Sequence, residues 1–101
     1  MLRAALSSML VMAALLSGAT QANADATLSC VFRGKTVQVV IANTKDGPRA
    51  CNAVCIWRYP GGLFRGLGGA ALEGGESKSA FNGTAPAPVE AVHSSNLSCN
   101  R

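Results

Sequence analysis

The sequence predicts an all-β fold, a small antiparallel β-sandwich of about six or seven short strands stapled by disulfides. Glycine or proline recurs about every 8 to 12 residues, and the intervening runs are rich in β-branched and aromatic residues. After residue 25, no stretch keeps apolar residues at helical spacing for three turns without a glycine or proline. An immunoglobulin-like arrangement is one candidate for such a sandwich.

Three strands carry the clearest pattern. Residues 26–32 and 36–43 alternate apolar and polar side chains, and a turn at Arg33-Gly34 separates them. A further turn is expected at Lys45-Asp46-Gly47-Pro48. Residues 50–59 place Cys51, Ala53, Cys55, Trp57 and Tyr59 on one face, so we expect a central strand there.

The rest of the chain is divided by turn residues. A tight turn at Tyr59-Pro60-Gly61-Gly62 leads into a glycine-rich return strand at residues 63–72, and a second turn at residues 73–76 leads into a strand at residues 77–82. Residues 84–88 are too rich in proline for a sheet interior and are expected to form an extended loop. A final strand is expected at residues 89–97.

The N-terminus has the pattern of an export signal. Arg3 precedes an apolar run at residues 4–16, and small residues follow, as in a cleavable secretory signal peptide. Cleavage is expected after Ala24, with Ala22 as the second choice. The alternative is an N-terminal membrane anchor, but the apolar run is shorter than the roughly 20 residues of a span. The expected product is one β domain, residues 25–101, secreted or periplasmic and without a membrane span.

Size and charge limit the function of this domain. Cleavage leaves 77 of the 101 residues, too few for a core that is more than marginally stable without staples. The whole chain has a net charge of +4, and loss of Arg3 leaves about +3. Nucleic-acid binding is not expected, because no run or stripe of basic residues follows a phosphate backbone.

The four cysteines predict a disulfide framework, because they are an even number in a short exported chain. If Cys51 and Cys55 share an extended strand, their Cα atoms lie about 13 Å apart, too far for a bridge. We favour Cys30–Cys55, formed if the first strand folds onto the opposite sheet, and Cys51–Cys99, which ties down the tail. The alternative pairing is Cys30–Cys99 with Cys51–Cys55.

Catalytic and metal sites are weakly supported. Cys51, Cys55, His93 and Cys99 could form a zinc site, but an oxidising compartment favours bridges, and His93 and Cys99 lie about 20 Å apart on a straight strand. A redox centre would need a Cys-x-x-Cys motif at a helix N-terminus. We therefore expect no metal and no cofactor.

Hydrolysis would need His93 as a base for Ser94 or Ser95. Ser94 points to the opposite face of a strand, and no G-x-S-x-G elbow is present. The carboxylates Glu73 and Glu76 flank a glycine turn and are expected to be solvated. We expect no enzyme activity.

The most distinctive segment is residues 57–65, which holds the only Trp, the only Tyr, one Phe and two arginines. Trp57 is expected in the core, because a Trp two residues after a strand cysteine commonly packs on a disulfide in a sandwich. The hairpin around Trp57 carries tyrosine and arginine, which are enriched in binding hot spots, and apolar residues next to them. The candidates for partner binding are Arg58, Tyr59, Leu63, Phe64 and Arg65.

The first strand and the turn after it, Leu28-Ser29-Cys30-Val31-Phe32-Arg33-Gly34-Lys35-Thr36-Val37, are similar to the start of periplasmic lysozyme inhibitors, which are also small disulfide-bearing β proteins. The similarity covers about ten residues. The family's inhibitory loop, with serine and glycine followed by tyrosine, has no counterpart here, and no functional residue is transferred.

The sequence therefore predicts an exported, non-enzymatic module that binds a protein or an envelope component. A small secreted inhibitor of a hydrolase is the first alternative, with residues 59–62 or 83–88 as the protruding loop. A zinc or redox protein is the second.

Overall fold

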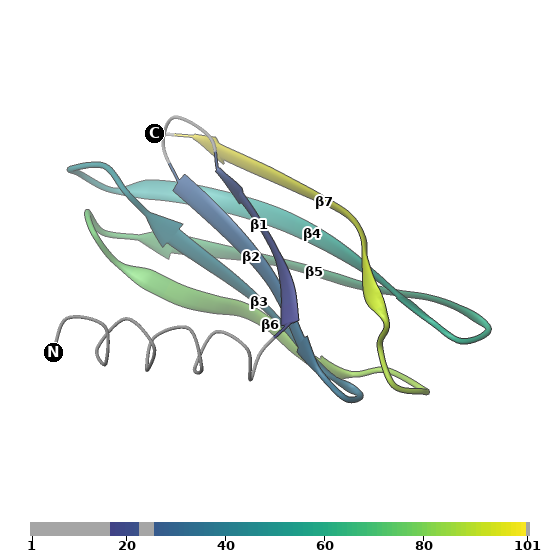
Figure 1. Ribbon diagram of the computed structural model, residues 1–101. Helices are drawn as coiled ribbons and strands as arrows, with labels where there is room; N and C mark the ends of the chain where they lie inside the picture. The colour runs from purple at the N-terminus through teal and green to yellow at the C-terminus, as the bar shows by residue number, and fades with distance from the viewer. Residues whose placement is uncertain (1–16, 23–25, 101) are drawn as a thin grey trace, which may run out of the picture.

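The computed structural model describes residues 17–22 and 26–100, which form seven strands in two antiparallel sheets (Figure 1). One sheet has the order β1-β2-β3-β6 and the other β5-β4-β7. The all-β sandwich predicted from the sequence is confirmed. The strands are β1 (Ser17–Ala22), β2 (Ala26–Arg33), β3 (Thr36–Asn43), β4 (Arg49–Tyr59), β5 (Gly62–Leu72), β6 (Ser77–Thr84) and β7 (Ala91–Asn100).

The strand order from β2 to β7 is compatible with the immunoglobulin-like arrangement. In an immunoglobulin sandwich, strands A, B and E lie in one sheet, C and F lie in the other, and variable-type domains add C′ to the second sheet. Here β2 and β3 pair as a hairpin, the chain changes sheet between β3 and β4, and β6 returns to pair with β3. β1 adds a strand to the sheet ahead of this pattern, beside β2.

Alternation of apolar and polar residues accounts for the core. Leu28 and Cys30 on β2 are fully buried, and so are Val39 and Ile41 on β3, whereas the residues between them lie on the outer face and are partly exposed. On β4 the expected inward face is buried from Cys51 to Trp57. The strand is central in its sheet, as predicted.

Several strand ends differ from the sequence-based expectation by one or two residues, and the last strand differs more. β7 begins at Ala91 because Val89 and Glu90 serve in the preceding connection, where their N–H groups donate to the carbonyls of Gly34 and Arg58 at 2.8 Å each. β7 continues to Asn100 because it pairs with β4 as far as Ala50. Each of the four expected turns contains a glycine with positive φ: Gly34, Gly47, Gly61 and Gly75.

The structure contains the disulfides Cys30–Cys55 and Cys51–Cys99, the pairing that the sequence favours. The first joins the two sheets, with 5.8 Å between its Cα atoms, and the second joins directly paired residues of β4 and β7. The route to the first differs from the expectation, because the chain crosses to the other sheet after β3 and not at the first strand.

β1 lies within the segment that the sequence assigns to the export signal. It pairs antiparallel with β2, with β7 on its other side (Figure 1). Most of the expected leader, residues 1–16 and 23–24, lies outside the described residues, so cleavage after Ala24 stays a prediction. Over the described part of the chain, no helix is long and apolar enough to cross a membrane.

Candidate functional site

The β4–β5 hairpin carries all five residues predicted to contact a partner, and it extends past the neighbouring strands at its end of the sandwich (Figure 1). The two strands pair without interruption from Arg49 and Leu72 to Tyr59 and Gly62. Gly61 at the turn has φ +100°, a conformation that glycine adopts without steric cost. The Tyr59 ring lies over Gly62, where a Cβ atom would come within 2.9 Å of the Tyr59 hydroxyl.

The strand register divides the five residues between two faces. Arg58 is paired with Leu63, and Arg65 with Ile56, so Arg58, Leu63 and Arg65 share the outer face of the sheet. Tyr59 and Phe64 fall on the same side as Trp57, which faces the core. The structure thus brings three of the candidates together and separates the other two from them.

Phe64 belongs to an aromatic cluster inside the sandwich. Its ring centroid lies 6.3 Å from that of Trp57 and 6.4 Å from that of Phe81, which are contact distances for tilted aromatic pairs. Trp57 is fully buried, as expected. Gly66 is also buried and makes room for this cluster, because a Cβ at that position would lie within 2.7 to 2.9 Å of the Phe81 and Trp57 rings.

The outer face of the β5-β4-β7 sheet carries an exposed apolar pair. Leu63 and Leu67 are 52% and 58% exposed and lie on the same side of β5 with Arg65 between them. Val54 and Ile56 on β4 lie beside them and are half-buried. We call the surface made by Arg58, Leu63, Arg65 and Leu67 the hairpin face.

A shallow depression of about 190 Å³ adjoins the hairpin face at Leu67. Amide and hydroxyl side chains border its apolar floor, so it could accept an apolar group with hydrogen-bonding edges. The depression is lined by Asn52, Ala53, Val54, Leu67, Asn96 and Ser98.

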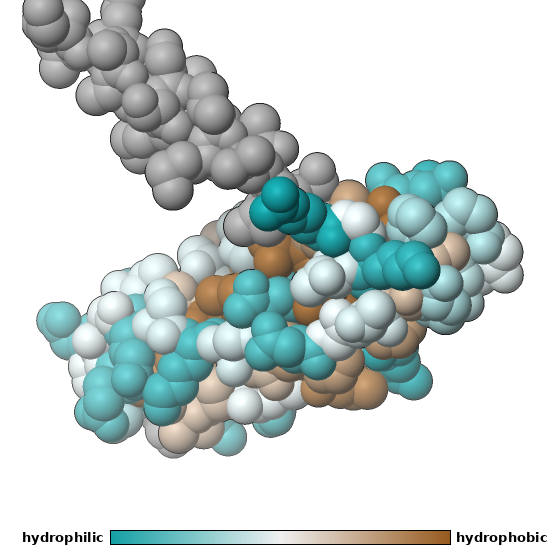
Figure 2. Space-filling view, turned by 90° about the horizontal axis from the view of Figure 1, so that it is seen from below, coloured by the Kyte–Doolittle hydropathy of each residue, from teal (hydrophilic) through white to brown (hydrophobic). Residues whose placement is uncertain are grey.

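Figure 2 shows another side of the molecule, where hydrophobic residues reach the surface in small patches among hydrophilic ones.

The hairpin face is basic. Arg58 lies 3.6 Å from the Glu90 carboxylate, and both side chains are more than half exposed, so solvent weakens this pair. Arg65 adds a second positive charge on the same side of the sheet. The combination of two guanidinium groups and two exposed leucines suits a partner surface that is both acidic and apolar.

The residues considered for metal or redox chemistry lie apart or are occupied. All four cysteines form disulfides. His93 is exposed at an irregularity of β7, between the pairs Trp57–Val92 and Ile56–Ser94. Within residues 17–22 and 26–100, no group of three or more His, Cys, Asp or Glu side chains is placed to hold a metal ion.

The carboxylates considered for catalysis serve turns and surface pairs. Glu76 Oε1 accepts a hydrogen bond of 2.9 Å from the Glu73 N–H and lies 3.7 Å from Lys78 Nζ. These contacts close the turn between β5 and β6. They describe a solvated turn, as the sequence predicted.

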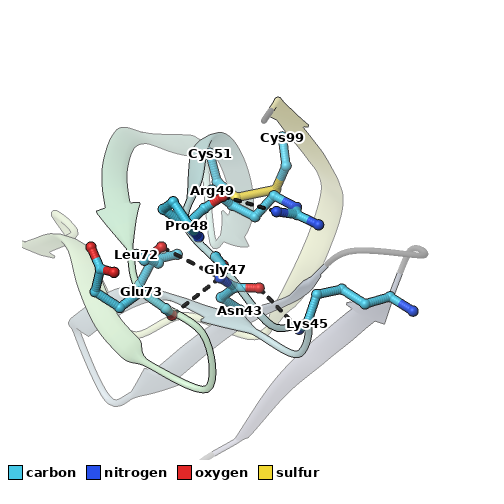
Figure 3. Close-up of a disulfide and its surroundings, with 9 residues drawn as sticks. All are labelled: Asn43, Lys45, Gly47, Pro48, Arg49, Cys51, Leu72, Glu73 and Cys99. Atoms are coloured by element: carbon cyan, nitrogen blue, oxygen red, sulfur yellow. Dashed lines mark hydrogen bonds between the residues drawn. A yellow bond between two sulfur atoms is a disulfide. The ribbon is translucent and has the colours of Figure 1, made fainter.

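One buried polar residue, Asn43, is not among the candidate residues predicted from the sequence (Figure 3). Its side chain is 1% exposed at the end of β3, where Nδ2 donates to the carbonyls of Gly47 at 2.9 Å and Glu73 at 3.1 Å and lies 3.4 Å from that of Leu72. Its Oδ1 accepts from the Lys45 N–H at 3.0 Å. Asn43 thereby joins the β3–β4 turn to the end of β5. The signal was present in the inward parity of β3, which Asn43 continues directly before a turn.

Comparison with known proteins gives no relative for this chain. No protein family, curated protein or solved structure matches it significantly.

Proposed function

We propose that this chain is an exported, non-enzymatic β domain that binds an acidic and apolar surface of a protein or envelope component through its hairpin face. The observation that carries the proposal is the placement of Leu63 and Leu67, both more than half exposed, beside Arg58 and Arg65 on a regular sheet. Exposed apolar side chains with arginine neighbours are typical of interface centres.

The scaffold supports this role because it is rigid behind the face. The Cys30–Cys55 bridge and the buried Trp57 lie directly under β4, on the inner side of the same sheet. Residues on a stiff sheet lose little conformational freedom on binding, which leaves more of the contact energy for affinity. Two disulfides also indicate an oxidising, extracellular type of environment, in keeping with the predicted export signal.

Affinity capture from the exported fraction of the source cells, with the pure protein immobilised, tests the proposal. Changing Leu63→Ser and Leu67→Ser together should reduce recovery of the captured partner about tenfold or more, since hot-spot truncations cost over 1 kcal/mol each. Arg58→Ala with Arg65→Ala should slow association and remove most of its salt dependence.

Lys45→Ala with Lys78→Ala is the matched control, because it removes the same charge from two exposed positions near the β3–β4 turn, at the opposite end of the sandwich from the β4–β5 turn. Capture that is equal for all these variants would refute the proposed face.

Inhibition of a hydrolase is the second candidate function, favoured by the projection of the β4–β5 turn (Figure 1). The other loop considered for it is less suitable. Ala85 and Val89 are 3% and 8% exposed, and their N–H groups donate to Lys35 and Gly34, so residues 85–89 are held against the β2–β3 turn. If the captured partner is a hydrolase, its activity should fall on titration with the pure domain, and Tyr59→Ala should weaken that inhibition. An unchanged activity at saturation excludes inhibition and leaves the binding proposal intact.

A further inference from the structure

The two ends of the sandwich differ in charge. Among the described residues, the end with the β4–β5 turn carries four basic side chains and one carboxylate, whereas the end with the β3–β4 and β5–β6 turns carries three of each. We call the first the basic end, and its charged residues, all exposed, are Arg33, Lys35, Arg58, Arg65 and Glu90. The net positive charge of the described chain is therefore concentrated where the hairpin projects (Figure 1).

Hydrogen bonds hold the parts of the basic end together. The Val89 N–H donates to the carbonyl of Gly34 in the β2–β3 turn, and the N–H of the next residue, Glu90, donates to the carbonyl of Arg58 on β4, at 2.8 Å each. The segment before β7 thereby ties the β2–β3 turn to the β4–β5 hairpin. The backbone segments that carry the four cations keep one arrangement as a result.

An apolar tip lies among these cations. Leu63, 52% exposed, is the second residue of β5 and is paired with Arg58. Tyr59, on the other side of the turn, is half-buried. Tyrosine is enriched at membrane–water interfaces because one end of its side chain is apolar and the other is polar.

We propose that the basic end docks on an anionic phospholipid bilayer, with Leu63 inserted at the boundary between headgroups and acyl chains. The inference deepens the proposed function, on which it rests, by naming the envelope component as a lipid surface. A bilayer supplies phosphates for the cations and an apolar interior for Leu63. A protein interface usually buries about 800 Å² on each partner, more than a hairpin tip offers, whereas lipids close around a tip of any shape.

Strand geometry sets the depth of insertion. Leu67 lies about 13 Å from Leu63 along β5, whereas interfacial apolar side chains enter a bilayer by about 5 to 10 Å. Leu63 therefore enters while Leu67 stays outside the acyl region. Arg65 lies about 7 Å behind Leu63, at the level of the headgroups, and the aliphatic stem of Arg58 lets its guanidinium reach back to the same level.

Vesicle cosedimentation tests the inference on the full chain, expressed with its own leader and purified after export. Vesicles of phosphatidylcholine with about one third phosphatidylglycerol should bind the protein at least about tenfold more tightly than vesicles of phosphatidylcholine alone, and added salt should weaken this binding.

Charge variants locate the surface. Each Lys or Arg near an anionic membrane raises partitioning about fivefold, so Arg33→Ala with Lys35→Ala should weaken binding to the anionic vesicles about 25-fold. Glu90→Gln removes the one carboxylate of the basic end and should strengthen binding about fivefold. Lys45→Ala with Lys78→Ala, at the opposite end, is the matched control and should bind like the unchanged protein.

Indole reporters measure the orientation. Leu63→Trp and Leu67→Trp each add an indole at an exposed position to the buried Trp57. With anionic vesicles, the emission of the first variant should shift to shorter wavelength much more than that of the second. Circular dichroism verifies that each variant is folded.

A folded protein that does not bind the anionic vesicles refutes the inference. So does equal binding to the neutral vesicles, a control pair that weakens binding as much as the loss of Arg33 and Lys35, or equal emission shifts at positions 63 and 67. A captured protein that depends on Leu63 and Leu67, without vesicle binding, overturns the lipid surface alone, whereas equal capture by all variants overturns the hairpin face itself.

Discussion

Asn43 offers the most direct test of what holds the sandwich together at the end where the β3–β4 and β5–β6 turns meet. Asn43→Ala removes two good donated hydrogen bonds, to Gly47 and Glu73, and one accepted from Lys45. The contact to Leu72, at 3.4 Å, is counted as weak because Nδ2 has only two hydrogens. At about 1 kcal/mol for each bond, the loss is about 3 kcal/mol of unfolding free energy.

Asn43→Asp keeps the shape of the side chain and removes its two N–H donors. The introduced carboxylate would face the carbonyl oxygens that Nδ2 now contacts, so burial and repulsion raise its pKa in the folded state above the unfolded value of about 3.9. The folded state then binds more protons than the unfolded state between the two pKa values. Relative to the unchanged protein, the variant should therefore be most stable below about pH 4 and lose stability as the pH rises to neutrality.

The assay is urea unfolding at about pH 4 and pH 7, with disulfides intact, followed by the fluorescence of the buried Trp57. Asn52→Ala, on the exposed outer face of β4, is the control and should change stability by less than about 0.5 kcal/mol. A cost below about 1 kcal/mol for Asn43→Ala, or a pH-independent cost for Asn43→Asp, would refute the reasoning.

Three further predictions concern packing, access and charge. Gly66→Ala should lower the unfolding free energy by about 1 to 3 kcal/mol, because the new methyl group meets the Phe81 and Trp57 rings, and an unchanged urea midpoint would contradict this. Under limiting dithiothreitol, Cys51–Cys99 should be reduced before Cys30–Cys55, because Cys99 is partly exposed whereas Cys30 and Cys55 are fully buried. Alkylation and peptide mapping measure the order of reduction, and the reverse order would contradict the prediction. Glu90→Gln should lower the unfolding free energy by less than about 1 kcal/mol, because the ion pair of Glu90 with Arg58 is solvent-exposed. A larger loss in urea unfolding would contradict this.

The sequence predicts the strands well because alternation and turn residues act locally. The span of β3 and the inward face of β4 follow from side-chain parity alone, and each glycine turn lies where a residue with positive φ is needed. The crossing between sheets after β3 could not be predicted in this way. A Lys-Asp-Gly-Pro turn is compatible with a hairpin or with a sheet change, and the choice depends on long-range packing of the Cys30–Cys55 bridge.

The sequence predicts which residues belong to the candidate site, but it does not predict which of them share one face of the sheet. Period-two alternation separates Arg58, Leu63 and Arg65 from Tyr59 and Phe64 only once the hairpin register is known. Leu67 does not stand out in the sequence, because the glycines around it weaken the alternating pattern of a strand. The parity of β3 marks Asn43 as an inward residue, but its contacts with the carbonyls of Leu72 and Glu73 do not follow from the sequence, because those two residues are distant along the chain.

The two bridges interleave along the chain, since each encloses one cysteine of the other. A chain threaded through a membrane from its N-terminus would deliver Cys30 and Cys51 first, and these two are not partners. Oxidation in order of emergence would therefore trap a wrong bridge. The native pairing requires that oxidation wait until Cys55 and Cys99 have arrived, or that thiol–disulfide exchange later correct it. The connectivity thus makes the maturation of this small domain depend on the timing of its oxidation.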